Sequence, residues 1–478
     1  MKAGSFGRGK WVFVDWRGIA PGYGTAWGGA VTDGFCMPEG VELKVHRPTL
    51  DLTPVIVRDA DKPWEAYGID NGVFLADGGR FRCWYLTLYP TGEARWRVAN
   101  RLAYAESDDG VTWRKPVLNL REFNGSKANN LTGVTGAYPS QYGTVFKDPS
   151  APPEARYKMV APGGKFGLCG AYSADGLMFT SCAEPILPAN HTDTDNTAWF
   201  NPERGVYSVY TRQAHGNKSQ RRAVNRSETA DFAHFPPSEP VIDVNPLDPP
   251  DWDYYNNAFL PWPGAVDAYL MRLAVYKRNS DTVEMHLAVS RDEKLWYRPE
   301  GRAPWIHTGD EFPMRFQSIY SCGGFLPTAA GEWSLYFTLW DMGHNELDAR
   351  LDRLNPMLVR GRIREDGFMS LSAEGHGQFW TVPFEWRCDR LRLNARTRHS
   401  GCVKCEVIEV EKAGVVGASA TAGKAAQGFS LDDCDAISGD HIDREVTWKG
   451  AADLSRFKGR EVQLRFSLFK ADLYALKF

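Results

Sequence analysis

An internal repeat constrains the fold of this chain more than any other feature of the sequence. A short aromatic-rich segment, preceded by a polar or glycine turn, occurs five times before residue 340. The copies are spaced by roughly 60 residues, which is room for about four short strands and their loops. Five such units predict an all-β fold with a five-bladed β-propeller. The copies lie at residues 79–85, 155–159, 204–210, 268–272 and 331–336.

A second element follows the first four copies. It consists of Ala-x-Ser, then acidic or glycine turn residues, and then an aromatic residue. Residues 105–113, 171–179 and 288–296 carry it clearly, and residues 225–232 carry a degenerate form. A strand, an acidic turn and a returning strand form a β-hairpin. We expect the Ser or Asp side chain to bond backbone amides inside each turn.

The composition supports a globular all-β protein and excludes two classes of function. Of 478 residues, 43% are hydrophobic, and 17 Trp, 19 Tyr and 25 Phe accompany 46 Gly and 29 Pro. This mixture is typical of many short strands joined by tight turns. The 56 Lys+Arg against 59 Asp+Glu leave a net charge of −3, which excludes a polybasic nucleic-acid binder. The sequence has no apolar run long enough to span a membrane.

The repeat ends near residue 380, and the remaining chain shows alternating strand patterns. We therefore expect three parts. Residues 1–55 are a lead-in that packs on the propeller, residues 56–380 are the propeller with the catalytic site, and residues 381–478 are a small antiparallel β-sandwich. A large two-sheet sandwich is the alternative for the repeat region. The C-terminal sandwich is the surface through which we expect a homo-oligomer, if one forms.

The cysteines and the N-terminus indicate a cytoplasmic protein. There are nine cysteines, an odd number, without the spacing of a disulfide framework. The positively charged start of the chain is not followed by the apolar segment of a signal peptide. A secreted protein whose signal was removed is the alternative.

The candidate site residues lie in the loops that precede the aromatic strands. In a propeller the entry ends of the inner strands converge on one funnel, so polar side chains from distant parts of the chain meet there. Carboxylates, amides and aromatics in one funnel suit a carbohydrate, because rings stack on sugars and charged groups bond hydroxyls. The catalytic candidates are Glu65, Asp70, Asp193 and Glu311, and the substrate-binding candidates are Trp64, Asn129, Asn130, His191, Asp195, Asp253, Arg315 and His344.

The expected chemistry needs no cofactor. The spacing His191-x-Asp193-x-Asp195 places alternate side chains on one face of an extended segment. Such a face suits a bound cation, and it suits sugar hydroxyls equally well. We therefore predict no metal as a required component.

Two segments resemble a known group of enzymes. Residues 68–73, followed by residues 79–85, are similar to the first-blade signature of the five-bladed glycosidases of families 32, 43 and 68. In that signature an Asp opens the first inner strand just before an Asn-Gly pair, as Asp70 does here. Residues 63–65, 105–116 and 123–130 resemble, more closely, a set of bacterial glycosidase-like or sialidase-like proteins with a C-terminal β-sandwich.

The resemblance implies a glycoside hydrolase, but it does not transfer every role. Family 32 enzymes carry an Arg-Asp-Pro and a Glu-Cys motif, and neither occurs at the expected place in this sequence. The acid and the transition-state stabiliser therefore cannot be assigned by the resemblance. We predict an exo-acting hydrolase of a furanoside or related non-reducing-end sugar, with a pair of carboxylates. Glu65 or Asp70 would be the nucleophile, and Asp193, Asp195 or Glu311 the acid.

Two other functions stay open at this stage. A glycoside phosphorylase on the same scaffold needs a basic phosphate pocket, to which Arg221, Arg222 or Arg315 with His344 could contribute. A non-catalytic carbohydrate-binding propeller would bind sugar without turnover. Phosphate dependence separates the first from a hydrolase, and the lack of a carboxylate pair in one pocket would indicate the second.

Overall fold

The computed structural model of the chain is all-β, as the repeat predicts. Within the described residues the only helices are short 3₁₀ turns, η1 (Pro63–Glu65), η2 (Pro153–Ala155) and η6 (Ser455–Phe457). None of these residues forms a helix long and apolar enough to cross a membrane. The structure describes residues 6–20, 37–91, 98–138, 143–163, 167–188, 192, 196–213, 221–308, 316–346, 356–410 and 424–478.

The chain divides into two compact units. In this division the N-terminal segment groups with the C-terminal unit rather than with the repeats. The predicted division into three parts stays a prediction. Unit 1 comprises Met1–His46, Pro261–Ala268 and Arg364–Phe478, and unit 2 comprises Arg47–Leu260 and Tyr269–Ile363.

Unit 1 contains one seven-stranded sheet. Its order is β2-β25-β29-β27-β28, and β1 and β26 also pair with β29. The two longest strands, β27 and β29, are antiparallel and pack over a core of buried aromatic and aliphatic side chains. The predicted β-sandwich stays a prediction. The strands are β1 (Lys10–Val12), β2 (Glu42–Val45), β25 (Met369–Trp380), β26 (Phe384–Glu385), β27 (Arg392–Glu409), β28 (Asp440–Glu445) and β29 (Glu461–Lys477).

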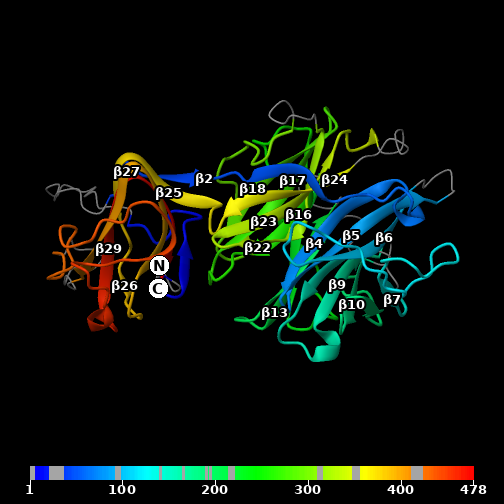
Figure 1. Cartoon of the computed structure of the whole chain (residues 1–478), viewed down its shortest axis with the longest axis horizontal. Coiled ribbons are helices and arrows are strands. Elements are labelled where there is room, and N and C mark those ends of the chain that lie inside the picture. Colours follow the sequence, from blue (N-terminus) through cyan, green and yellow to red (C-terminus); the bar gives the residue numbers. More distant parts are fainter. Residues whose placement is uncertain are drawn as a thin grey trace. The chain divides into compact units, whose positions relative to one another are not determined.

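Unit 2 contains four sheets. The first three are small antiparallel meanders, and two of these three carry one added strand. Their orders are β21-β4-β5-β6, β7-β11-β10-β9-β8 and β12-β13-β14-β15. Figure 1 shows β4, β5 and β6 as neighbouring arrows in blue. The strands are β4 (Gly68–Asp77), β5 (Arg80–Pro90), β6 (Val98–Ser107), β7 (Gly133–Thr135), β8 (Thr144–Lys147), β9 (Tyr157–Pro162), β10 (Leu168–Ser173), β11 (Met178–Ser181), β12 (Thr197–Asn201), β13 (Val206–Gln213), β14 (Ala223–Thr229), β15 (Glu239–Ile242) and β21 (Gly323–Gly324).

The fourth sheet has nine strands, in the order β16-β17-β18-β20-β23-β24-β3, with β19 and β22 beside it. It consists of two successive meanders joined by a single register pair, Val283 with Ser318. The five-blade count stays a prediction. The strands are β3 (Thr49–Ile56), β16 (Trp252–Pro261), β17 (Tyr269–Lys277), β18 (Thr282–Ser290), β19 (Trp296–Tyr297), β20 (Ser318–Ser321), β22 (Leu326–Ala329), β23 (Glu332–Trp340) and β24 (Met357–Arg364).

The five aromatic repeat segments form the second strand of successive meanders, namely β5, β9, β13, β17 and β23. These strands have a neighbour on both edges, and their residues are mostly buried. Sheet packs on sheet through them: Trp84 and Leu86 of β5 lie in one core cluster with Val145 of β8 and Tyr157 of β9. The repeat is therefore a signature of strands covered on both faces.

The expected hairpin turns are confirmed in three places. In the first, Ser107 Oγ accepts hydrogen bonds from the backbone N–H of Asp109 and Gly110, and Asp109 Oδ1 accepts from Val111 and Thr112. Burial opposes ionisation of Asp109, but these hydrogen bonds outweigh it and hold its pKa at about 2. The turns after Ser173 and Ser290 repeat the pattern.

Buried or partly buried carboxylates near the strand ends form a second regular feature of unit 2. Each accepts a hydrogen bond from a tyrosine hydroxyl and pairs with Lys or Arg. We call these contacts the inter-sheet carboxylates. They are Asp77 (with Arg82, Lys147 and Tyr157), Asp148 (with Lys158 and Tyr207), Asp248 (with Tyr254 and Arg298) and Glu293 (with Tyr210 and Arg226).

Replacing Gly324 with Ala tests the contact between β21 and β4. Gly324 has φ +75°, and an added Cβ would overlap the backbone carbonyl oxygen of Phe74. Gly301 has φ +64° and open space around it, so Gly301→Ala is the matched control for backbone strain. We expect Gly324→Ala to lower the free energy of unfolding by about 2 kcal/mol more than the control. Equal values in urea titrations would contradict the close approach of the two strands.

Asp148 tests the inter-sheet carboxylates. Burial opposes its ionisation, but hydrogen bonds from Lys158 and Tyr207 outweigh it and hold the pKa of Asp148 below its usual value. A lowered folded-state pKa gives stability that is present above the unfolded pKa, about 3.9, and is lost as the pH falls through the folded pKa. We expect Asp148→Asn to cost about 2 kcal/mol at pH 7 and progressively less below about pH 4.

The measurement is the free energy of unfolding against pH. Glu154→Gln is the control, because Glu154 is an exposed carboxylate of η2 nearby in sequence. A difference between Asp148→Asn and wild type that stays constant down to pH 3 would show that the charge of Asp148 does not stabilise the fold.

Candidate functional site

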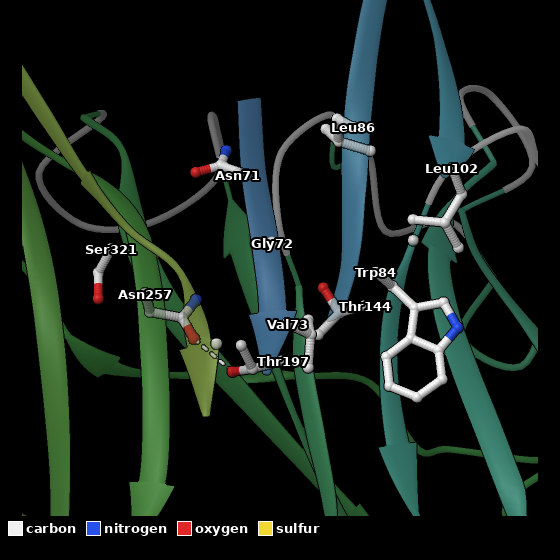
Figure 2. A pocket seen from close by; sticks show the side chains of 12 residues that line it. Asn71, Gly72, Val73, Trp84, Leu86, Leu102, Thr144, Thr197, Asn257 and Ser321 are labelled. Carbon is white, nitrogen blue, oxygen red and sulfur yellow. Dashed lines mark hydrogen bonds between the residues drawn. The ribbon is translucent and has the colours of Figure 1, made fainter. Parts of the chain in front are cut away.

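A pocket lies where all four sheets of unit 2 meet. It is lined from β4, β8, β12, β16 and β20, and β8, β12 and β16 are edge strands of their sheets. Its empty space, counted with the part open to solvent, is about 350 Å³. Figure 2 shows Asn71, Asn257 and Ser321 on separate strands around this space.

The pocket wall presents amides and hydroxyls. Thr197 Oγ1 donates to Asn257 Oδ1 at 2.6 Å (Figure 2). Within the described part of the chain, Asn257 Nδ2 and Asn71 Oδ1 are buried and have no hydrogen-bond partner. A buried donor and a buried acceptor without partners are costly unless a ligand or water satisfies them. The pocket therefore offers hydrogen bonds of both directions to a polar guest.

A β-bulge places Asp70 beside this pocket. The register of β4 on β5 shifts between Asp70 and Gly72, and Asn71 takes the left-handed φ of +28°. Bulges redirect side chains and occur next to active sites. Asp70 is partly exposed, and its Oδ1 accepts the Asn71 backbone N–H at 2.8 Å. Asp70 directly precedes Asn71, which lines the pocket, and the predicted catalytic carboxylates Asp193 and Glu311 lie outside the described residues.

Aromatic rings of β16, β17 and β20 gather around His344, which follows β23. His344 Nδ1 lies 2.6 Å from the Tyr320 hydroxyl, and its ring centroid lies 4.3 Å from that of Tyr255 and 4.9 Å from that of Tyr276. Tyr255 lies two residues before Asn257 on β16, and Tyr320 directly precedes Ser321 on β20. We call this group the tyrosine–histidine cluster.

Burial and nearby charges set the protonation of His344 and Tyr320 in the tyrosine–histidine cluster. Burial lowers the pKa of His344 to about 4, and Arg222 and Arg212 add to this shift. Burial and the charge of Asp70 raise the pKa of Tyr320. At neutral pH the imidazole is therefore uncharged and the phenol keeps its proton, and the tautomer of His344 sets which of the two groups donates the hydrogen bond. The predicted substrate-binding role of His344 is compatible with this position.

Glu65 lies elsewhere, in the interior. Its side chain is fully buried and accepts hydrogen bonds from the Tyr85 hydroxyl at 2.7 Å and from Lys115 Nζ at 2.6 Å. The backbone N–H of Asp59 donates to the second oxygen as well. Because these partners occupy both carboxylate oxygens away from solvent, the contacts of Glu65 favour a structural role, and its predicted catalytic role stays a prediction.

Three predicted substrate-binding residues belong to the same interior network. Trp64 Nε1 donates to Asn130 Oδ1, and Asn130 Nδ2 donates to the Tyr85 hydroxyl. Asn129 Nδ2 bonds backbone carbonyls of its own loop. All three side chains are buried. Their predicted contact with a sugar is replaced by contacts that hold the loop before β7 against the first sheet.

Asp253 also has protein partners. It lies buried on β16 and accepts hydrogen bonds from the backbone N–H and the guanidinium of Arg222. Through this pair it orients Arg222 toward the tyrosine–histidine cluster, since the Arg222 guanidinium lies 5.3 Å from the Tyr255 ring. Asp253 therefore supports the cluster instead of contacting a substrate. The predicted residues His191, Asp193, Asp195, Glu311 and Arg315 lie outside the described residues.

Sequence reasoning missed Tyr255, Tyr276 and Tyr320. Tyr255 belongs to a run of Tyr and Asn at the beginning of β16. This place before an aromatic strand could have marked it as a site residue. Tyr320 and Tyr276 carry no comparable mark, because they lie inside ordinary strands. Among the described residues, no group of three or more His, Cys, Asp or Glu could hold a metal ion. The segment predicted to suit a cation is not among them.

No protein-family model matches the chain, and no curated protein matches it. Several solved structures are similar in fold at low identity. The catalytic domain of a Coprinopsis cinerea GH62 α-L-arabinofuranosidase is 11% identical with a TM-score of 0.43, and the match covers 66% of this chain and 97% of that one.

Two further structures match over a similar share of the chain. A thermostable family-43 glycoside hydrolase is 13% identical with a TM-score of 0.43, covering 64% of this chain and 92% of that one. A member of the GH130 family of mannoside phosphorylases and hydrolases is 11% identical with a TM-score of 0.41, covering 66% and 94%. The resemblance of the sequence to families 32 and 68 and to sialidase-like proteins stays a prediction.

Glu65→Gln tests the structural role of Glu65. The amide leaves the partly buried Lys115 ammonium without its counter-charge, so we expect a loss of about 2 kcal/mol in the free energy of unfolding. Glu106→Gln is the control: Glu106 pairs with Arg80 and Arg114, which are half exposed, and such pairs contribute about 1 kcal/mol or less. A Glu65 variant as stable as wild type would contradict the assignment.

Proposed function

We propose that this chain is a glycoside hydrolase whose active site is the pocket between the four sheets, with Asp70 as the nucleophile or general base. The observation that carries the proposal is the combination of a carboxylate, unpartnered amide groups and hydroxyls at this pocket. A partly exposed carboxylate on a bulge lies beside buried amide groups that lack partners, and edge strands of several sheets supply hydroxyls. Sugars need donors and acceptors of this kind together with a carboxylate.

The reaction requires a second carboxyl group. One carboxylate attacks the anomeric carbon or activates water, while the other protonates the leaving oxygen. Asp193, Asp195 and Glu311 remain the candidates for this acid. A pocket, in contrast to an open groove, suits the end of a sugar chain, which supports the proposed exo action on a furanoside or related non-reducing-end sugar.

Asp70→Asn tests the proposal. The amide keeps the size of the side chain but removes its charge, and we expect kcat to fall about 10²-fold or more on the cognate substrate. The assay is a panel of aryl furanosides and pyranosides, with turnover normalised to folded protein. Asp61→Asn, at an exposed aspartate before η1, is the control and should leave kcat unchanged. Turnover within a few-fold of wild type in Asp70→Asn would remove Asp70 from the mechanism.

A phosphorylase is the second candidate, and one observation favours it. Arg222 and His344, expected from the sequence to contribute to a phosphate pocket, come together in the tyrosine–histidine cluster. Arg221 instead bonds the backbone carbonyls of Pro249 and Trp252. Turnover that requires inorganic phosphate and releases a sugar phosphate would favour the phosphorylase. Sugar binding without turnover under either condition would favour the carbohydrate-binding propeller.

A further inference from the structure

A second concave surface lies on the first sheet of unit 2, apart from the pocket. We call it the β5–β6 groove. Its empty space, counted with the part open to solvent, is about 1000 Å³. Tyr89 and Phe123 pack edge to face in it, with ring centroids 5.0 Å apart. The lining residues are Pro63, Ala66, Tyr89, Pro90, Thr91, Ala99, Arg101, Glu122, Phe123 and Asn124.

Arg101 is the cationic residue among those that line this groove, and Glu122 is the anionic one. Its guanidinium lies 5.4 Å from the Tyr89 ring, and one Nη donates to the carbonyl of Asn100. Among the described residues no carboxylate forms an ion pair with it, Glu122 of the rim included. Burial lowers the pKa of Arg101, and the neighbouring Arg121 lowers it further. A partly desolvated guanidinium beside a second one favours an anion as its partner.

The groove opens at the same end of the sheet as Asp70. Arg101 on β6 pairs with Thr87 on β5, and Thr87 pairs with Ile69 on β4. Ile69 directly precedes Asp70, so two strand spacings separate the two sites, about 10 Å across the sheet. Side chains alternate between faces, which places Arg101 on the face opposite Asp70. The groove is therefore a site separate from the pocket. A ligand that passes over the ends of the strands could reach both.

We propose that the β5–β6 groove binds an acidic oligosaccharide, with Arg101 holding the carboxylate of a uronate unit and Asn124 and the aromatic floor contacting the sugar. Guanidinium groups match carboxylates with two parallel hydrogen bonds, and aromatic surfaces contact sugar rings. The shared position at one end of the sheet favours a saccharide over a peptide, since it places the groove beside the proposed sugar site. The inference rests on the proposed function for the nature of the ligand.

Binding is measured by calorimetry on the full chain with three probes, tetramers of galacturonate, glucuronate and mannuronate. The same tetramers after carboxyl reduction serve as neutral probes. We expect at least one acidic tetramer to bind and its reduced form to bind at least tenfold more weakly. Arg101→Gln should lose at least tenfold, and Arg101→Lys should lose less, because it keeps the charge without the planar fork.

Matched variants separate this site from others. Arg80→Gln, at the other end of β5 and half exposed, controls for net charge and should bind as wild type. Asp70→Asn should also bind as wild type, whether or not it remains active, so failure of the hydrolase proposal and failure of this one are distinguishable. Loss of binding in Asp70→Asn would show that the tetramer occupies the pocket and would overturn the proposal.

Four other results would overturn it. These are no binding by any acidic tetramer, equal binding of the reduced forms, an unchanged affinity in Arg101→Gln, and equal competition by an acidic peptide of the same charge. Circular dichroism melts of both Arg101 variants exclude unfolding as the cause of lost binding.

Discussion

The arrangement of unit 2 depends on buried or partly buried carboxylates near its strand ends. Each of them accepts a tyrosine hydroxyl and pairs with Lys or Arg from a neighbouring strand or sheet. A buried charge without a partner is costly, so each carboxylate requires its partners in place and thereby sets how two sheets meet. Packing of aromatic strands supplies most of the burial, and these contacts supply the specificity of the arrangement.

The site is a consequence of that arrangement. Where sheets meet, their edge strands β8, β12 and β16 expose backbone and side-chain polar groups that no further strand covers. A pocket at this point is therefore polar without any local motif. Asn71, Thr197 and Asn257 contribute to it although they are far apart in the sequence, because β4, β12 and β16 line the same space.

Glu65 and Asp70 show how local geometry separates two similar residues. Glu65 lies in the 3₁₀ turn before β4, where its side chain points into the interior and finds Tyr85 and Lys115. Asp70 lies on a bulge within β4, directly before the pocket residue Asn71, and is partly exposed. Five residues of separation thus divide a structural carboxylate from a candidate catalytic one.

The sequence by itself determined the all-β class, the aromatic strand of each meander and the Ser-Asp hairpin turns. These follow from local rules, because aromatic strands covered on both faces and turns closed by side chains are marked by their own residues. It also named Asp70 as one of four catalytic candidates, and that role stays a proposal. Tertiary structure decided three other features. These are the buried contacts of Glu65, the position of Tyr255, Tyr276 and Tyr320 around His344, and the groove at Arg101. Each depends on which strands become neighbours, and contacts between residues far apart in the chain leave no local pattern.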